Sequence, residues 1–185
     1  MNYLTSTTWL ELFELPKKLQ NIEFTKLWNS HPPNFEKVKV WGKTFNTPRY
    51  QKCYGKNYKY SGVMHTSTPI PDDYNELIKY FSNRYDCEYN MMLINWYENG
   101  NHYIGFHSDN EKNLNFEAPI ITISLGASRN FVIKSIDKTF KKKIELKNYD
   151  VLVMGGTFQK THLHGIPKQK KIKDPRISIT LRVFN

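Results

Sequence analysis

The chain has 185 residues, with 27 Lys and Arg against 17 Asp and Glu, which gives a formal net charge of +10. This length suits one domain that buries a real core without disulfides or a structural metal. Aromatic residues make up 15% of the chain, which excludes a disordered, mostly solvated protein. The two cysteines have no metal-site or disulfide spacing, and we find no long apolar run or signal peptide. These features predict a soluble intracellular protein, in the nucleus or the cytoplasm.

The positive charge comes mainly from lysine, since the chain has 22 Lys and 5 Arg. A field of this sign attracts polyanions, although an excess of lysine can also serve solubility alone. Between the two interpretations we favour nucleic-acid binding. With so few arginines, each is expected to be present for planar, bidentate hydrogen bonding rather than for charge.

The first 37 residues predict a helical segment. A short capped helix is expected over Thr7–Leu15, ended by Pro16, because its apolar residues recur at helical spacing. A second helix is expected over Asn21–Trp28 on the same grounds.

A basic hairpin is predicted next, with Val38 and Val40 in strand alternation and Gly42 at the turn. Trp41 near the tip could insert between stacked bases. The residues alone favour the other interpretation, in which Trp41 is a core residue under a loop. Tyrosines then alternate with cations, which suits base stacking and phosphate contact and equally an ordinary strand and loop. The residues are Tyr50, Tyr54, Tyr58 and Tyr60 with Arg49, Lys52, Lys56 and Lys59.

A helix is expected from Asp72 or Asp73, which can cap it, to about Tyr85. From Tyr89 onward the pattern changes to short strands separated by turns. Eight strands after a helical first half predict a β-sandwich or barrel-like core with helices packed outside. These strands are Asn90–Tyr97, His102–His107, Ile120–Leu125, Asn130–Lys134, Lys142–Leu146, Val151–Met154, His162–Ile166 and Pro175–Phe184.

A metal site is suggested by His107 and Asp109, which share one face of an extended strand. One further histidine would complete the two-histidine, one-carboxylate triad of non-haem Fe(II) oxygenases. His162 and His164 also share a face, so spacing alone leaves the choice between them open. A lone His-x-Asp is weak evidence. The order of parts strengthens it: His-x-Asp, then strands, then histidine, then a strand with two arginines.

The last strand alternates between an apolar and a polar face. If the polar face points into a barrel, it forms a buried anion site, because a buried arginine needs a carboxylate or phosphate partner. Otherwise its arginines are surface charges. Asn95 and Tyr97 alternate in the same way and could bond the same anion. The polar face consists of Arg176, Ser178, Thr180 and Arg182, and the apolar face of Ile177, Ile179, Leu181 and Val183.

Taken together, these motifs resemble the AlkB family of Fe(II)- and 2-oxoglutarate-dependent dioxygenases, which reverse alkylation damage on nucleic-acid bases. The resemblance covers about residues 38–184 and is strongest to the branch that acts on duplex DNA. It is carried by Asn95-Trp96-Tyr97, Gly105 to Glu111, Pro119 to Phe131, Thr161 to Pro167 and Pro175 to Arg182, with Val40 to Lys43, Pro48-Arg49 and Tyr60-Ser61-Gly62 extending it.

The resemblance implies an α+β fold with a double-stranded β-helix, or jelly-roll, core and N-terminal helices packed outside. The whole chain, 1–185, would then be a single dioxygenase domain. Its parts would be the helical segment 1–37, a β-hairpin lid for nucleotide recognition at 38–68, and the catalytic core at 89–185.

The resemblance also implies the role of individual residues. The iron ligands would be His107, Asp109 and His164, and the 2-oxoglutarate pocket Asn95, Tyr97, Arg176, Ser178 and Arg182, with Arg176 on the distal carboxylate and Arg182 nearer the metal. Substrate would be bound by Val40, Trp41, Gly42, Arg49, Tyr58, Tyr60 and Glu111, with Tyr60 and His107 on either side of a flipped base. Three positions depart from the family pattern: Ser178 replaces Asn, Asn110 replaces an acid, and Trp41 replaces a smaller aromatic residue.

The implied activity is oxidative demethylation of N1-methyladenine and N3-methylcytosine in DNA. It would use Fe(II), 2-oxoglutarate and O2, and release succinate, CO2 and formaldehyde. Flipping out the damaged nucleotide costs roughly a few kcal/mol, and least where base pairing is already broken. The expected partner is alkylated DNA, mainly duplex, with single-stranded DNA or RNA as further candidates. We expect a monomer that binds no membrane.

Three alternatives remain at this point. The same chemistry could act on RNA or on a protein side chain. The chain could also be a catalytically inactive nucleic-acid-binding module, although the complete triad and both arginines argue against that. A zinc hydrolase is weaker, because no residue stands out as a general base.

Overall fold

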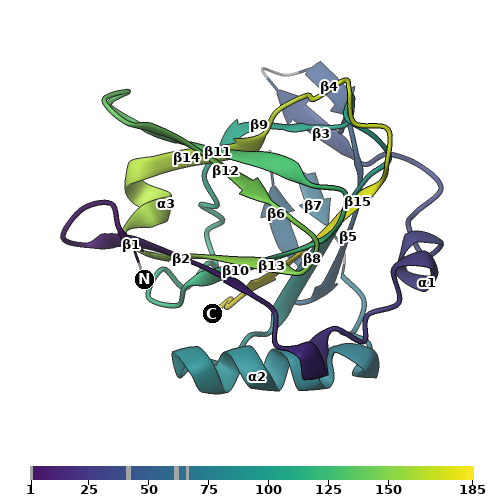
Figure 1. Ribbon diagram of the computed structural model, residues 1–185, viewed down its shortest axis with the longest axis horizontal. Helices are drawn as coiled ribbons and strands as arrows, with labels where there is room; N and C mark the ends of the chain where they lie inside the picture. Colours follow the sequence, from purple (N-terminus) through teal and green to yellow (C-terminus); the bar gives the residue numbers. More distant parts are fainter. Residues whose placement is uncertain (1, 41–42, 61–62, 66) are drawn as a thin grey trace.

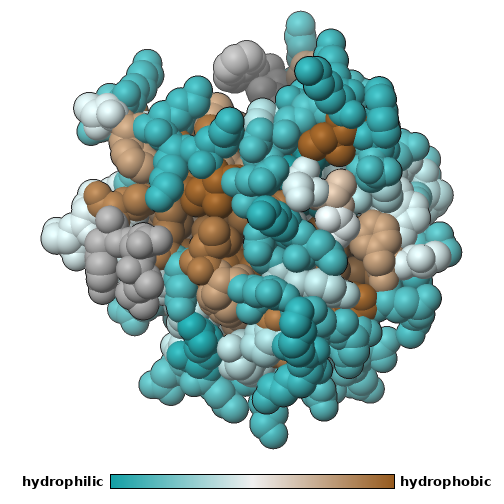
Figure 2. Space-filling model, viewed as in Figure 1, coloured by the Kyte–Doolittle hydropathy of each residue, from teal (hydrophilic) through white to brown (hydrophobic). Residues whose placement is uncertain are grey.

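The computed structural model describes residues 2–40, 43–60, 63–65 and 67–185. Figure 1 shows two β-sheets that face each other, with the long helix α2 (Asn75–Tyr85) below the larger sheet and the short helix α1 (Phe24–Trp28) at one side. In the same view, Figure 2 shows apolar side chains gathered between the sheets, while hydrophilic side chains cover most of the remaining face.

All eight strands predicted after residue 89 are present, and they are divided equally between the two sheets. The larger sheet has the order β1-β2-β13-β10-β15-β8-β5, and the smaller has the order β12-β11-β14-β9. An eight-stranded, two-sheet arrangement of this kind is a jelly roll, so the predicted fold class is confirmed. The eight strands are β8 (Met91–Tyr97), β9 (Ile104–His107), β10 (Ile120–Gly126), β11 (Arg129–Ser135), β12 (Lys141–Leu146), β13 (Asp150–Gly156), β14 (His162–Ile166) and β15 (Arg176–Arg182).

Strand β15 is buried on both faces. Its apolar residues Ile177, Ile179 and Leu181 belong to the same cluster as Leu77 and Phe81 of α2, so this face packs under the helix. Complete burial of each such side chain stabilises the fold by about 1.5–3 kcal/mol. The polar face of β15 therefore points the other way, into the space between the sheets, as the inward-facing alternative predicted.

The prediction of a helix over Thr7–Leu15 is wrong. This segment is strand β2 (Thr8–Glu14), which pairs with β13 from Thr8 opposite Gly156 to Glu14 opposite Asp150. Its apolar residues fit both helical and strand spacing, and the free edge of β13 decides between them because it offers a continuous row of backbone partners. The N-terminal segment is thus largely a part of the main sheet, extended by β1 (Asn2–Tyr3) and followed by the 3-10 turn η1 (Lys17–Leu19).

The other two predicted helices are present. Helix α1 is shorter than expected, and the indole Nε1 of Trp96 holds it to the sheet by donating to the carbonyl of Leu27 at 2.9 Å. The second forms as the 3-10 turn η2 (Asp72–Tyr74) followed by α2. No helix in the described part of the chain is long and apolar enough to span a membrane.

The segment 38–68, expected to be a lid, consists of two hairpins joined by a strand of the main sheet. The hairpins are β3 (Lys37–Val40) with β4 (Lys43–Asn46) and β6 (Tyr58–Tyr60) with β7 (Val63–His65). The joining strand, β5 (Tyr50–Gly55), pairs with β8. The segment expected to be a lid is therefore anchored through β5 in the larger sheet.

Replacing Gly155 with alanine is expected to destabilise the fold, because a Cβ there would lie 2.0 Å from the indole of Trp9. The rigid ring would have to move away from β13, and overpacking of this kind costs about 1–3 kcal/mol. Thermal unfolding would show it as a decrease of roughly 3–10 °C in Tm. The matched control is Gly105→Ala, since a Cβ there meets nothing within 4 Å. Equal melting of the two variants would contradict the contact between β2 and β13.

Candidate metal and cosubstrate site

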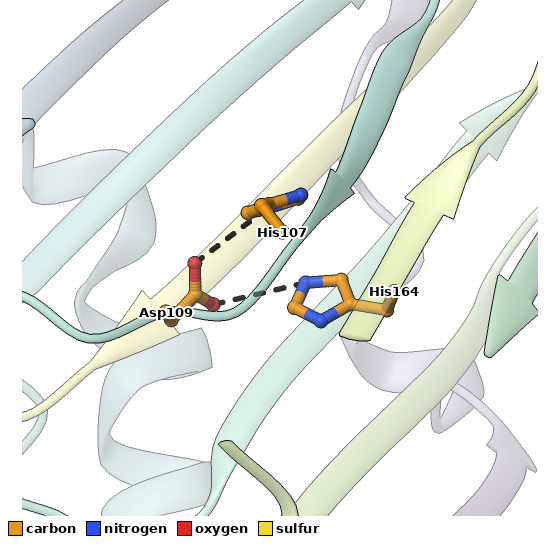
Figure 3. A group of neighbouring side chains, drawn as sticks. All are labelled: His107, Asp109 and His164. Carbon is orange, nitrogen blue, oxygen red and sulfur yellow. Dashed lines mark ion pairs between the residues drawn. The ribbon is translucent and has the colours of Figure 1, made fainter. Parts of the chain in front are cut away.

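Strands β9 and β14 bring two histidines close together, with their ring centres 4.3 Å apart. His107 ends β9 and pairs directly with His164 of β14, and Asp109 follows two residues after His107. In Figure 3 the Asp109 carboxylate lies to one side of the two imidazoles and faces both of them. Its oxygens are 3.7 Å from His107 Nε2 and 3.9 Å from His164 Nε2. The three potential ligand atoms all lie within 4.8 Å of one another. The structure therefore brings together the three residues expected to bind iron.

The protonation states suit a metal ion. Burial, and then the neighbouring His107, lower the pKa of His164 to about 3, and burial also lowers the pKa of His107. Burial alone would raise the pKa of Asp109, but Arg182 and the two imidazoles outweigh it and bring that pKa below its ordinary value. At neutral pH the site thus has two neutral imidazoles and one carboxylate, which are the forms that bind metals.

His162, the alternative ligand, lies outside this group. Its ring stacks on Phe158 at 5.3 Å, and its Nδ1 is 2.8 Å from the hydroxyl of Thr161. The two histidines share a strand, but only His164 lies opposite His107. Strand pairing therefore places His164, and not His162, beside His107 and Asp109.

A cavity between the sheets is lined in part by His107, Asp109 and His164. The polar residues of β15 line it, together with the inward-facing residues of β8 that were expected to bind the same anion. All five residues expected to bind 2-oxoglutarate are in its lining, which includes Asn95, Tyr97, His107, Asp109, Thr122, His164, Arg176, Ser178, Thr180 and Arg182.

Arg176 is the buried cation of this cavity. Its guanidinium is 1% exposed, and Nε donates to the hydroxyl of Ser124 at 3.0 Å. Its Nη1 and Nη2 have no hydrogen-bond partner among the described residues, and its Cζ lies 5.2 Å from the centre of the Tyr97 ring. Burial lowers the pKa of Arg176 to about 10, so the group is still charged at neutral pH. Two aligned donors on a buried cation fit a carboxylate, such as that of 2-oxoglutarate.

Arg182 lies at the metal end of the cavity, where the resemblance placed it. Its Nη2 donates to Asp109 and its Nη1 to Glu111, both at 2.8 Å. Glu111 was expected to read the base, but it is only 6% exposed and engaged in this pair. Burial raises the pKa of Glu111 despite the neighbouring arginine. Arg182 thereby fixes the orientation of the carboxylate of Asp109, a candidate metal ligand.

The remaining residues expected to bind substrate have different surroundings. Arg49 is buried, and its Nε donates to Asn95 Oδ1 at 2.7 Å, so it contacts a residue that lines the cavity. Val40 ends β3, and Tyr58 and Tyr60 lie in β6. Trp41 and Gly42 lie outside the described residues.

Residues 2–182 match the model of the family described as the 2OG-Fe(II) oxygenase superfamily. The chain belongs to this superfamily. Iron and 2-oxoglutarate, the predicted cofactor and cosubstrate, are thereby confirmed, and the donor set of the site fits both. Two imidazoles and one carboxylate on one face leave positions open for further ligands, as Fe(II) oxygenases require.

Relatives of this oxygenase include AlkB-type enzymes. DNA oxidative demethylase ALKBH2 of Mus musculus is 31% identical over 162 residues, which cover 79% of this chain and 66% of that protein. The chain spans 56–66% of the length of its mammalian ALKBH2 relatives. The RNA replication protein of Grapevine virus A is 35% identical over 129 residues, or 70% of this chain and 7% of that protein. The solved structure of OsALKBH1 matches with a TM-score of 0.68 at 19% identity over 98% of both chains, which supports the fold.

Sequence reasoning missed two residues that support the site of this oxygenase. The side-chain oxygen of Gln159 accepts the backbone N–H of Asp109 at 2.9 Å, which fixes the loop after β9. Arg129 is 1% exposed and donates to the carbonyls of Asn99, His102 and Pro167. Arg129 thereby joins the loops beside the cavity. The chain has only 5 arginines, so Arg129 could have been expected to have a specific role. Nothing in the sequence marks Gln159.

Proposed function

We propose that this oxygenase removes alkyl groups from damaged bases in DNA by oxidative demethylation, with N1-methyladenine and N3-methylcytosine as its substrates. The observation that carries the proposal is the cavity itself, in which a His-Asp-His cluster adjoins the buried Arg176, whose Nη1 and Nη2 have no hydrogen-bond partner among the described residues. The ALKBH2 relatives, which are DNA oxidative demethylases by name, point to the substrate class.

Each part of the site would have a defined task. His107, Asp109 and His164 would hold Fe(II), and Arg176 would bind the distal carboxylate of 2-oxoglutarate. Iron and 2-oxoglutarate, when bound, supply with O2 the oxidation of the N-alkyl carbon, after which the base is restored and formaldehyde is released. Arg182 would keep the Asp109 carboxylate oriented, and the walls of the barrel would exclude bulk water from the reacting atoms.

The surface charge favours a nucleic-acid substrate. The net charge is +10, and four lysines in the loop between β14 and β15 are exposed: Lys168, Lys170, Lys171 and Lys173. Backbone hydrogen bonds from Gln169 N–H to the carbonyl of Gly100 and from Gly100 N–H to the carbonyl of Ile172 hold this loop beside the turn that follows β8. The lysines of this loop would contact phosphates while a flipped nucleotide enters the site.

The test is release of succinate and formaldehyde on an oligonucleotide with one N1-methyladenine, supplied as duplex DNA, single-stranded DNA and RNA. Wild type is expected to release both products in equal amounts, most on the duplex, and His107→Ala to release neither. Release of succinate without formaldehyde on all three oligonucleotides would reject repair of this lesion and leave an oxygenase with another substrate.

Alkylated RNA is the second candidate substrate. The similarity to a viral protein named for RNA replication favours it. Product release on the RNA oligonucleotide that exceeds release on both DNA forms would replace the DNA proposal by this one.

A further inference from the structure

Arg49 connects the lid to the interior of the barrel. It lies between the hairpin β3–β4 and strand β5, and the hydroxyl of Thr47 donates to its carbonyl at 2.9 Å. Its side chain is turned inward and is 4% exposed, with Nε donating to Asn95 Oδ1 at 2.7 Å. Both the backbone and the side chain of Arg49 are therefore held in one arrangement.

This contact decides how the Asn95 amide is oriented. The oxygen and nitrogen of an asparagine side chain are nearly equal in size, so a half-turn exchanges an acceptor for a donor. Arginine has no acceptor, so the Asn95 atom that Arg49 contacts must be the oxygen. Asn95 also lines the cavity, and with its oxygen bound to Arg49 its amide nitrogen is turned away from that residue.

We propose that Arg49 is a positioning residue for 2-oxoglutarate, acting by locking Asn95 with its N–H donors toward the cosubstrate. This inference rests on the proposed role of the cavity as the 2-oxoglutarate site. A flipped amide would present its oxygen to an anionic ligand, which exchanges an attractive contact for a repulsive one. The Arg49 guanidinium thereby determines whether Asn95 presents hydrogen-bond donors or an acceptor to the cavity.

The neighbouring polar row shows why such a lock is needed. Asn95 pairs with Gln51 on one side and with Ser178 on the other. Gln51 is 2% exposed, and its Oε1 has no hydrogen-bond partner among the described residues. A serine hydroxyl can donate or accept. A side chain that can only donate is required to fix the amide, and Arg49 meets that requirement.

The experiment measures 2-oxoglutarate binding by calorimetry on the full chain loaded with Mn(II), without any nucleic acid. Arg49→Met is expected to raise the Kd for 2-oxoglutarate by about 10-fold, the size expected for one hydrogen bond to a charged group. The control is Lys52→Met on the adjoining strand β5, which removes an equal charge from a residue that pairs with Ile94 rather than with Asn95. We expect it to bind within about 2-fold of wild type.

A double-mutant cycle separates positioning from a general effect of charge. If Arg49 acts through Asn95, adding Arg49→Met to Asn95→Ala should change the Kd by no more than about 2-fold. A further 10-fold loss in that background would overturn the proposal, as would an unchanged Kd in Arg49→Met alone. If the methionine variant does not fold, Arg49→Lys takes its place. Lysine also only donates, so it should bind 2-oxoglutarate more tightly than Arg49→Gln, which permits the flip, and equal binding would again overturn the proposal.

The outcomes also distinguish this inference from the proposed function. Wild type that fails to bind 2-oxoglutarate would reject the cosubstrate site itself. Wild type that binds, with Arg49→Met binding equally well, rejects only the positioning role. Because the assay contains no nucleic acid, a wrong assignment of the damaged base affects neither result.

Discussion

Replacing Arg176 with methionine is expected to abolish 2-oxoglutarate binding without destabilising the protein. The guanidinium is fully buried, and two of its nitrogens have no hydrogen-bond partner among the described residues. Removing one partner of a buried ion pair costs about 3–5 kcal/mol, which corresponds to a Kd higher by roughly 100-fold or more. Without the cosubstrate, the same group is an uncompensated buried charge, and an apolar side chain of similar volume should be tolerated at least as well.

Calorimetry with Mn(II) and thermal unfolding without 2-oxoglutarate test the two halves of this prediction. The control is Arg84→Met, because Arg84 pairs with Glu11 outside the barrel. That variant should keep its affinity for 2-oxoglutarate and lose at most about 1 kcal/mol of stability. Wild-type affinity in Arg176→Met would place the anion site elsewhere. A large fall in its Tm would instead show that Arg176 stabilises the fold.

His164→Ala should lose metal binding, whereas His162→Ala should keep it. The two histidines lie on one strand, two residues apart, but only His164 is grouped with His107 and Asp109. Loss of a residue that merely supports a ligand weakens metal binding by about 10–100-fold, so loss of a ligand should exceed about 100-fold. His162 packs against Phe158, and its removal should mainly cost stability.

Titration with Mn(II) or Co(II) measures this difference directly. The comparison is matched, because both variants remove one imidazole from β14 and leave the net charge unchanged at neutral pH. We expect His162→Ala to bind metal within a few-fold of wild type. Equal loss in both variants would show that the strand, rather than the ligand, had been disrupted. The reverse order would assign the third ligand to His162.

The sequence predicted the jelly-roll half of the molecule well because its strands alternate clearly. In β15 the apolar Ile177, Ile179 and Leu181 face α2, and the two arginines face the cavity, as the period of two required. The Thr8–Glu14 strand was missed because Trp9, Leu10 and Phe13 recur at helical spacing, whereas in the strand Leu10 lies on the opposite face from Trp9 and Phe13. Its partner, β13, is far away in the sequence, so local pattern could not reveal the pairing that decides it.

The sequence predicted which residues would lie together around the cavity, but not the contacts among them. His107, Asp109 and Arg176 follow from strand parity and from the chemistry of their side chains. The choice of His164 over His162 depends on the register between β9 and β14, which spacing does not contain. The inward turn of Arg49 depends on β5 joining β8, and the burial of Glu111 depends on Arg182 reaching it across the barrel. Each of these is a tertiary contact between distant segments.

The pairing of His107 with His164 would give a metal ion bound there a second role. Strand β9 is only four residues long and lies at the edge of the smaller sheet, with Phe106 44% exposed beside the ligand. A metal held by both histidines is a cross-link between segments that are far apart in the chain, comparable to a disulfide that closes a long loop. Loss of the ion should therefore fray this edge strand first, and hydrogen exchange at β9 would report occupancy of the site in the absence of any substrate.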